Sequence, residues 1–340
     1  MSGAAANGRR VDLLNIGLML GSCVLAFALP FDLFLFSYAV LGPLHYLTEI
    51  SWLHKRDYFL PRRRDALLLV VPLALLLAAH WGREHGGSGL RMEFWGTLLN
   101  AAGLGLAVAL VATRDARWRA GIVGAALLAG WAFADRSAVH DLLRVLLPTL
   151  IHVWLFTGAF VLLGALRARS PTGLASLAVF VACSAACFLI QPRTWPLQVR
   201  PAYGSIMGVN EIVFGWFEGR PAQGLPELLG SQPGRGIVRF IAFAYTYHYL
   251  NWFSKTSIIQ WHRIPRWWTW TNLSLWAASV ALYAYDYALG LAVLFGLSYL
   301  HVYLELPLNG RSFAGIGREL VAVARGRGAG ARAPGDATAR

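Results

Sequence analysis

The chain has 340 residues, of which 57% are hydrophobic and only 14% are charged. A soluble domain carries roughly 25% charged residues, so this composition excludes an ordinary soluble protein and indicates a membrane protein with several spans. The net charge of +13 could indicate nucleic-acid binding, but the basic residues lie between apolar runs rather than in one patch. Membrane topology and anionic lipids account for that distribution, and we expect no nucleic-acid partner.

Ten apolar runs are candidates for membrane-spanning helices, which need about 20 residues at about 1.5 Å per residue. The first two runs are separated at Pro30, because proline disrupts a helix and the nearby Asp32 is costly in lipid. The sequence therefore predicts an all-α fold, a polytopic transmembrane helix bundle. The predicted spans are residues 12–29, 33–50, 66–80, 94–112, 119–134, 142–166, 173–190, 237–253, 269–286 and 288–307.

The distribution of lysine and arginine predicts the orientation of the bundle, since cytoplasmic segments carry an excess of these residues. With a cytoplasmic N-terminus and ten crossings, the inner segments hold 21 of them and the outer segments hold eight. Treating residues 12–50 as one kinked span would place Arg62, Arg63 and Arg64 outside, and we reject that interpretation. We expect both termini in the cytoplasm and a multi-pass protein of the inner (plasma) membrane.

Residues 191–236 form one long outer loop that is rich in proline and glycine but also carries aromatic residues such as Trp216. Loops of this length are usually functional or disordered. The aromatic residues favour packing on the membrane surface, with a short interfacial helix near residues 208–218. We expect residues 1–320 to form a single integral-membrane domain and residues 321–340 to form a disordered, basic cytoplasmic tail.

Histidine recurs near the predicted inner ends of three apolar runs, each time beside other polar side chains. Residues four apart lie on one helix face, so His45 and Glu49 point the same way, as do His301 and Glu305. Ionisable groups at membrane depth cost roughly 2.5–3.5 kcal/mol each and tend to face a bundle interior. The alternative is that the rings lie near the interface and bond to neighbouring helices. The set that three helices would bring together is His45, Glu49, His248, Asn251, Lys255, His301 and Glu305.

Imidazole and carboxylate together suit iron, manganese or zinc, and two histidines with one carboxylate is a known iron-oxygenase ligand set. We predict bound iron, with manganese or zinc as alternatives, and His45, His248 and His301 as ligands. His152 lies near the middle of the sixth span, four residues after Pro148. It is a candidate fourth ligand, a proton-relay group or a partner of a nearby hydroxyl. The predicted catalytic residues are Glu49 and Glu305, as ligands or bases, and Asn251 and Lys255, as contacts to the substrate or the ligands.

These residues predict an integral membrane enzyme that oxidises or hydroxylates a lipid or isoprenoid-like substrate at the cytoplasmic leaflet. Arg56 and Arg263 would bind the substrate head group, because arginine pairs bidentately with phosphate or carboxylate. The expected partners are membrane lipids and a hydrophobic small-molecule substrate. The histidine boxes of membrane desaturases are absent, which counts against that class. An acyl- or glycosyl-type transferase with a histidine base, and a transporter or channel, are the alternatives.

Overall fold

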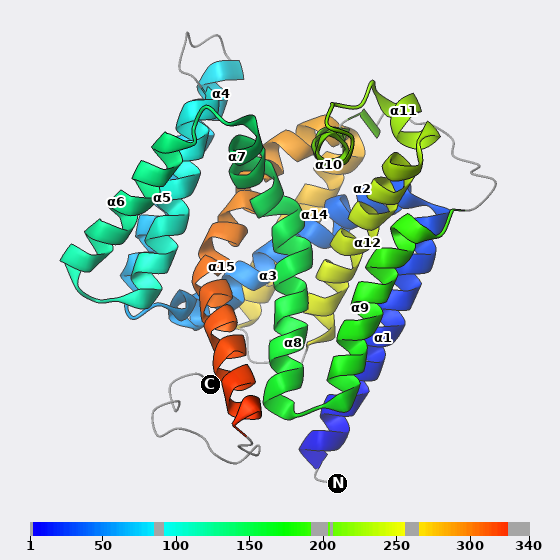
Figure 1. The fold of residues 1–340 in the computed structure, drawn as a ribbon, viewed down its shortest axis with the longest axis horizontal. Helices are drawn as coiled ribbons and strands as arrows, with labels where there is room; N and C mark the ends of the chain where they lie inside the picture. Colours follow the sequence, from blue (N-terminus) through cyan, green and yellow to red (C-terminus); the bar gives the residue numbers. More distant parts are fainter. Residues whose placement is uncertain (1–2, 85–91, 192–202, 205–206, 256–264, 326–340) are drawn as a thin grey trace.

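The computed structural model describes residues 3–84, 92–191, 203–204, 207–255 and 265–325. Within these ranges every regular element is a helix and none is a strand (Figure 1). The prediction of an all-α fold is therefore confirmed.

In the first half of the chain, a π-helical turn connects the second and third helices. Short 3₁₀ turns follow the third helix. In chain order the elements are α1 (Gly3–Ala28), α2 (Pro30–Phe36), the π-helical η1 (Ser37–Leu41), α3 (Gly42–Lys55), η2 (Asp57–Phe59), η3 (Arg63–Asp65), α4 (Ala66–Glu84), α5 (Met92–Ala112) and α6 (Ala116–Ala132).

The second half contains a longer π-helical stretch, η4, which continues directly into an α-helix. Its elements are α7 (Ser137–Asp141), η4 (Leu142–Phe156), α8 (Thr157–Ala168), α9 (Pro171–Leu189), α10 (Met207–Glu218), α11 (Leu225–Gly230), α12 (Gln232–Ser254), α14 (Arg266–Tyr285) and α15 (Tyr287–Ala324). Each apolar run that the sequence predicts as a span lies within one of these helical stretches, apart from at most two residues at its ends, although some helices extend well beyond their runs.

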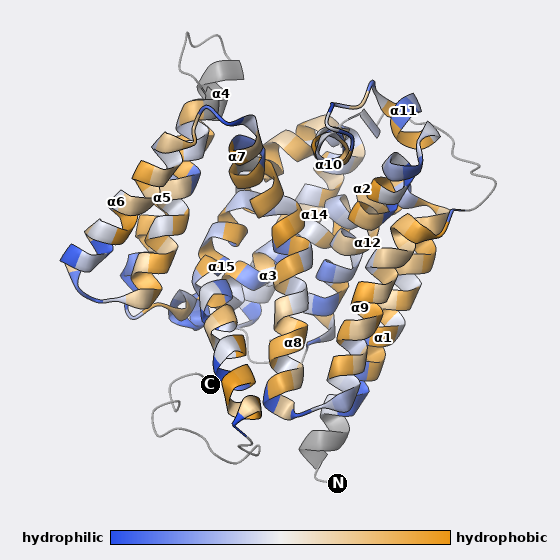
Figure 2. Cartoon of the chain, in the orientation of Figure 1, coloured by the Kyte–Doolittle hydropathy of each residue, from blue (hydrophilic) through white to orange (hydrophobic). Residues whose placement is uncertain are grey.

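Six helical stretches among the described residues are long and apolar enough to cross a membrane, and they indicate a membrane protein. Hydrophobic residues run along the lengths of α1, α5, α6 and α9, whereas hydrophilic residues gather near the ends of the bundle (Figure 2). Large apolar side chains such as Val24 and Leu128 are mostly exposed. Contact with lipid is favourable for such side chains, whereas contact with water is unfavourable. The other four predicted spans fall on α4, α6, α12 and α14, and ten crossings stay a prediction.

The chain breaks where the sequence predicts it to break. Helix α1 ends at Ala28, Leu29 leaves helical geometry, and Pro30 is the first residue of α2. Proline suits this position because its missing N–H would have no partner in the first turn of a helix. Asp32 also lies in that first turn, where the helix dipole favours a negative charge. The chain then reverses direction, so residues 12–50 are not one continuous helix (Figure 1).

The described part of the segment between α9 and α12 contains two short helices, α10 and α11. The predicted helix at residues 208–218 coincides with α10, on which Trp216 is half exposed. Arg220 pairs with Glu227 of α11 and closes the turn between the two helices. The hydrogen bonds that Glu227 accepts from Arg220 and from the backbone of Gln223 lower the pKa of its carboxyl group to about 2.

Four helical stretches run in the same direction through the centre of the bundle: α2–α3, α7–η4–α8, α12 and α15 (Figure 1). Helix α12 is buried along most of its length and contacts α1, α2 and α9. Each of the four stretches carries a buried histidine about 15 residues after its first residue: His45, His152, His248 and His301 follow by 15, 15, 16 and 14 positions, respectively. Equal offsets along helices that run the same way bring the histidines to one level of the bundle.

The predicted orientation can be tested at two exposed arginines, because α1 begins and α15 ends at the same end of the bundle (Figure 1). The native cysteines are all buried and should react little. In intact spheroplasts we expect a membrane-impermeant maleimide to label Arg136→Cys, before α7, but to label Arg114→Cys, before α6, only after permeabilisation. Labelling in the reverse order would invert the topology, and equal labelling of both would show that α6 does not cross.

Candidate metal centre

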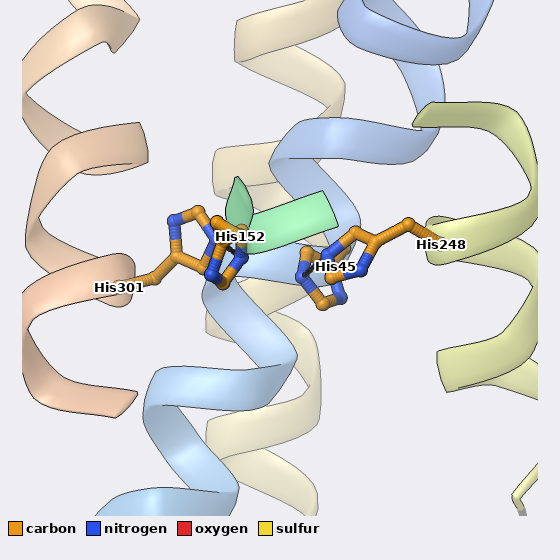
Figure 3. A group of neighbouring side chains, drawn as sticks. All are labelled: His45, His152, His248 and His301. Atoms are coloured by element: carbon orange, nitrogen blue, oxygen red, sulfur yellow. Dashed lines mark hydrogen bonds between the residues drawn. The ribbon is translucent and has the colours of Figure 1, made fainter. Parts of the chain in front are cut away.

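Four histidines from four helices meet in the interior of the bundle. Each offers one ring nitrogen, and these four nitrogens all lie within 4.8 Å of one another. The rings approach from different sides and turn toward a common centre (Figure 3). They are His45 of α3, His152 of η4, His248 of α12 and His301 of α15, and their exposed fractions lie between 1% and 7%.

The rings make two close nitrogen pairs. His45 Nε2 lies 3.1 Å from His248 Nε2, and His152 Nε2 lies 3.2 Å from His301 Nε2. In a pair of neutral imidazoles one nitrogen donates and the other accepts, so the two rings fix each other's tautomers. The buried Nδ1 of His45 makes no hydrogen bond within the described part of the chain. Such an atom is costly to bury. A cation between the rings would satisfy the lone pairs of the nitrogens that face one another in the two pairs.

Two carboxyl groups lie beside this ring of histidines. Glu49 Oε2 is 3.0 Å from His45 Nε2, one turn along the same helix, as the sequence predicts. Glu305 makes a contact that the sequence did not predict, because its Oε2 lies 3.2 Å from Nδ1 of His152 on η4. Each histidine pair therefore has one carboxyl group next to it, and Glu305 ties α15 to η4.

The two carboxyl groups also interact with each other, and Lys255 lies within electrostatic range of both. Lys255 follows the last residue of α12, and Asn309 on α15 donates a hydrogen bond of 3.5 Å to Glu305. Glu49 and Glu305 are 2% and 3% exposed, so their charges would need a counter-ion. When both are ionised, their charge of −2 balances one divalent cation.

The π-helical stretch η4 places His152 in this group. A π-helix contains wider turns than an α-helix and often marks a functional site. Pro148 lies inside η4, where it cannot donate a backbone hydrogen bond. Immediately after η4, Thr157 Oγ1 lies 2.8 Å from Nδ1 of His248. A hydrogen bond on Nδ1 orients an imidazole and leaves Nε2 available to a metal ion.

The remaining predicted site residues do not join the ring of histidines. Asn251 is buried on α12, but its side-chain oxygen makes no hydrogen bond to the described residues. The guanidinium of Arg56 lies over the ring of Trp52 at 5.4 Å. Arg263 lies outside the described residues. The catalytic role of Asn251 and the head-group role of the arginines stay predictions.

A small cavity adjoins three of the four histidines, His152, His248 and His301. The sequence prediction missed most of its other walls, which include Tyr38, Tyr46, Tyr245, Tyr249 and Tyr299. One signal was available in the sequence. His45-Tyr46-Leu47 and His248-Tyr249-Leu250 repeat the same tripeptide, and the structure places both of these tyrosines on the cavity.

Comparison of the chain with protein families, with curated proteins and with solved structures finds no match. The chemistry of the site is therefore argued from its own residues. Four neutral imidazoles suit iron, zinc, copper or nickel, and adjacent carboxylates extend the choice to manganese. The ring of histidines has the donor set and the burial of a metal centre.

Thr157 provides a test of how this centre is held together. Thr157→Val keeps the shape of the side chain but removes the hydroxyl beside Nδ1 of His248. We expect it to lower metal affinity by about 10- to 100-fold, because the ring loses its orienting partner. We also expect a loss of about 1–3 kcal/mol in the free energy of unfolding. Metal titration and denaturant unfolding would measure the two effects.

Thr246→Val is the matched control. It removes a buried hydroxyl from α12, the helix that carries His248. The Thr246 hydroxyl lies 2.7 Å from the hydroxyl of Ser37 and away from the ring of histidines. This variant should lose stability and keep the metal affinity of the unchanged protein. Equal metal affinities for both variants would show that Thr157 does not support the site.

Proposed function

We propose that this protein is a metal-dependent enzyme embedded in the membrane, which oxidises or hydroxylates a lipid or isoprenoid-like substrate. The observation that carries the proposal is the buried ring of four histidines with two carboxyl groups beside it. Ionisable residues at membrane depth are costly and generally functional. Six such groups on three α-helices and one π-helix are difficult to explain by packing alone.

Iron is the metal that best fits this reaction, with manganese or zinc as alternatives. His45, His152, His248 and His301 would hold the ion, which supplies the ability to activate dioxygen. The carboxyl group of Glu305, beside Nδ1 of His152, would orient that imidazole, and Glu49 and Glu305 together would compensate the charge of the ion. Because the rings are at most 7% exposed, bulk water is kept away from the reacting atoms.

The setting of the site supports a hydrophobic substrate. The six apolar helices would be surrounded by lipid, in which a hydrocarbon chain dissolves. On the predicted topology, the carboxyl groups and Lys255 lie toward the cytoplasm. Arg56 and Arg263 would bind a phosphate or carboxylate head group at that surface. The proposed location is the inner (plasma) membrane.

Hydroxylation by this route uses dioxygen as the oxidant. One oxygen atom enters a C–H bond of the substrate and the other leaves as water. The balance requires two electrons and two protons from outside the bundle, and a soluble electron-transfer protein is the chemical class that would deliver the electrons. An oxidation that inserts both oxygen atoms into the substrate needs no such reductant.

Two contacts support a second candidate, a transferase that uses a histidine base. The pairs His45–Glu49 and His152–Glu305 resemble a general base with an orienting carboxylate. This chemistry would transfer an acyl or glycosyl group without a metal. Its activity would survive removal of metal by a chelator, whereas the activity of a metal-dependent oxidase would be lost.

Metal content distinguishes the two candidates. We expect detergent-purified protein, produced with metals supplied, to contain about one equivalent of iron, because the four imidazoles converge on one centre. His248→Ala and His301→Ala should each remove most of that metal. Elemental analysis of the three proteins measures this directly.

His54→Gln is the control for these substitutions. His54 lies on the same helix as His45 but outside the ring, with its Nδ1 3.0 Å from the hydroxyl of Tyr58. This variant should keep its metal. Purified protein without metal would contradict the proposed oxidase and favour the histidine-base transferase. Metal that persists in both ring variants would contradict the assigned ligands.

A further inference from the structure

The ring of histidines has two chemically different sides. The four helices that carry it run in the same direction, so residues that precede the histidines lie on one side and residues that follow lie on the other (Figure 1). Charged groups occupy the following side, with Glu49, Lys255 and Glu305. Most walls of the small cavity come from the preceding side, including Tyr38, Thr149, Tyr245 and Ser298, and Tyr46 and Tyr249 join them although each follows its histidine by one residue.

The size of the cavity limits what it can hold. It offers about 30 Å³ to the centres of water-sized molecules. By this measure roughly 10–15 Å³ is needed for one water molecule. The cavity therefore has room for a molecule of two or three heavy atoms and is too small for a lipid chain. A molecule held there would be small and could not be the hydrophobic substrate.

Two tyrosines give the cavity a hydrogen-bond donor beside the metal centre. The ring of Tyr46 stacks on the ring of His301, with centroids 4.3 Å apart, and its hydroxyl lies 2.9 Å from the hydroxyl of Tyr249. In such a pair one hydroxyl donates and the other accepts, so the accepting residue can direct its own O–H to another partner, such as Tyr38, Ser298 or a molecule in the cavity.

The backbone next to this pair is shaped to admit it. A Cβ atom at Gly42 would lie 2.9 Å from the hydroxyl oxygen of Tyr46 and 3.3 Å from that of Tyr249. The absence of a side chain at this position leaves room for both hydroxyl groups one turn ahead of His45.

We propose that this cavity binds dioxygen next to the metal and that the Tyr46–Tyr249 hydroxyl pair donates a hydrogen bond to it. The inference rests on the proposed oxidase function and names the site of its small co-substrate. Dioxygen is apolar and diatomic, so it matches both the aromatic walls and the volume of the cavity. As it gains electrons it becomes negatively charged, and a fixed hydroxyl donor stabilises that charge.

Nitric oxide is a diatomic probe that binds ferrous iron and reports itself by absorption and electron paramagnetic resonance. The iron-loaded, full-length protein would be titrated anaerobically with nitric oxide. We expect Tyr46→Phe and Tyr249→Phe each to weaken binding by about two- to tenfold, the effect of one lost hydrogen bond. Iron content should be unchanged in both variants.

Tyr303→Phe is the matched control, because Tyr303 is a buried tyrosine of α15 whose hydroxyl donates to Asn100 at 2.8 Å, away from the cavity. It should bind nitric oxide as the unchanged protein does. Equal binding by the unchanged protein, Tyr46→Phe and Tyr249→Phe would overturn the proposed hydrogen bond.

A cavity-filling substitution tests the location itself. Ser298→Leu places bulk in the cavity and should weaken nitric oxide binding at least tenfold. Ser312→Leu, at a buried serine of α15 that does not line the cavity, should not. Unchanged binding in folded, iron-loaded Ser298→Leu would overturn the site. A protein that holds no iron would instead contradict the proposed function, so the two failures are distinguishable.

Discussion

The structure depends on one constraint: buried polar groups have no water to bond with and must find one another. Four imidazoles and two carboxyl groups are at most 7% exposed in a bundle whose outside is apolar. Their contacts join residues that are far apart in the chain, such as His45 with His248 and His152 with Glu305. These contacts therefore link α3 to α12 and η4 to α15.

The direction of these helices gives the site its two sides. Helices that run the same way place residues with equal offsets at equal depth, so the residues before the histidines form one surface and those after form another. The first surface is rich in tyrosine hydroxyls and the second carries Glu49, Lys255 and Glu305. A reaction at the metal would thus have a small-molecule cavity on one side and charge compensation on the other.

The helical runs and the polar residues were predictable from the sequence because each depends on local pattern. The apolar runs predicted where the helices lie, and Pro30 predicted the first break between helices. The four-residue spacing of His45 and Glu49 predicted the contact between their side chains. The partner of Glu305 was not predictable in this way. His152 lies on a π-helical stretch, which has more residues per turn than an α-helix. The face on which His152 approaches α15 therefore cannot be predicted from α-helical spacing. Tyr46 and Tyr249 were not predicted as site residues because tyrosine is common near the membrane–water interface. Only the fold shows that both line one cavity.

Charge balance limits how many ions such a site can hold. The four imidazoles bind a metal as neutral ligands, so only Glu49 and Glu305 supply negative charge. One divalent ion with both carboxylates is neutral, and Lys255 adds one positive charge at the edge. A second divalent ion would raise this to three positive charges in surroundings of low dielectric constant, where unpaired charge is costly. The residues around the ring of histidines therefore favour a single ion.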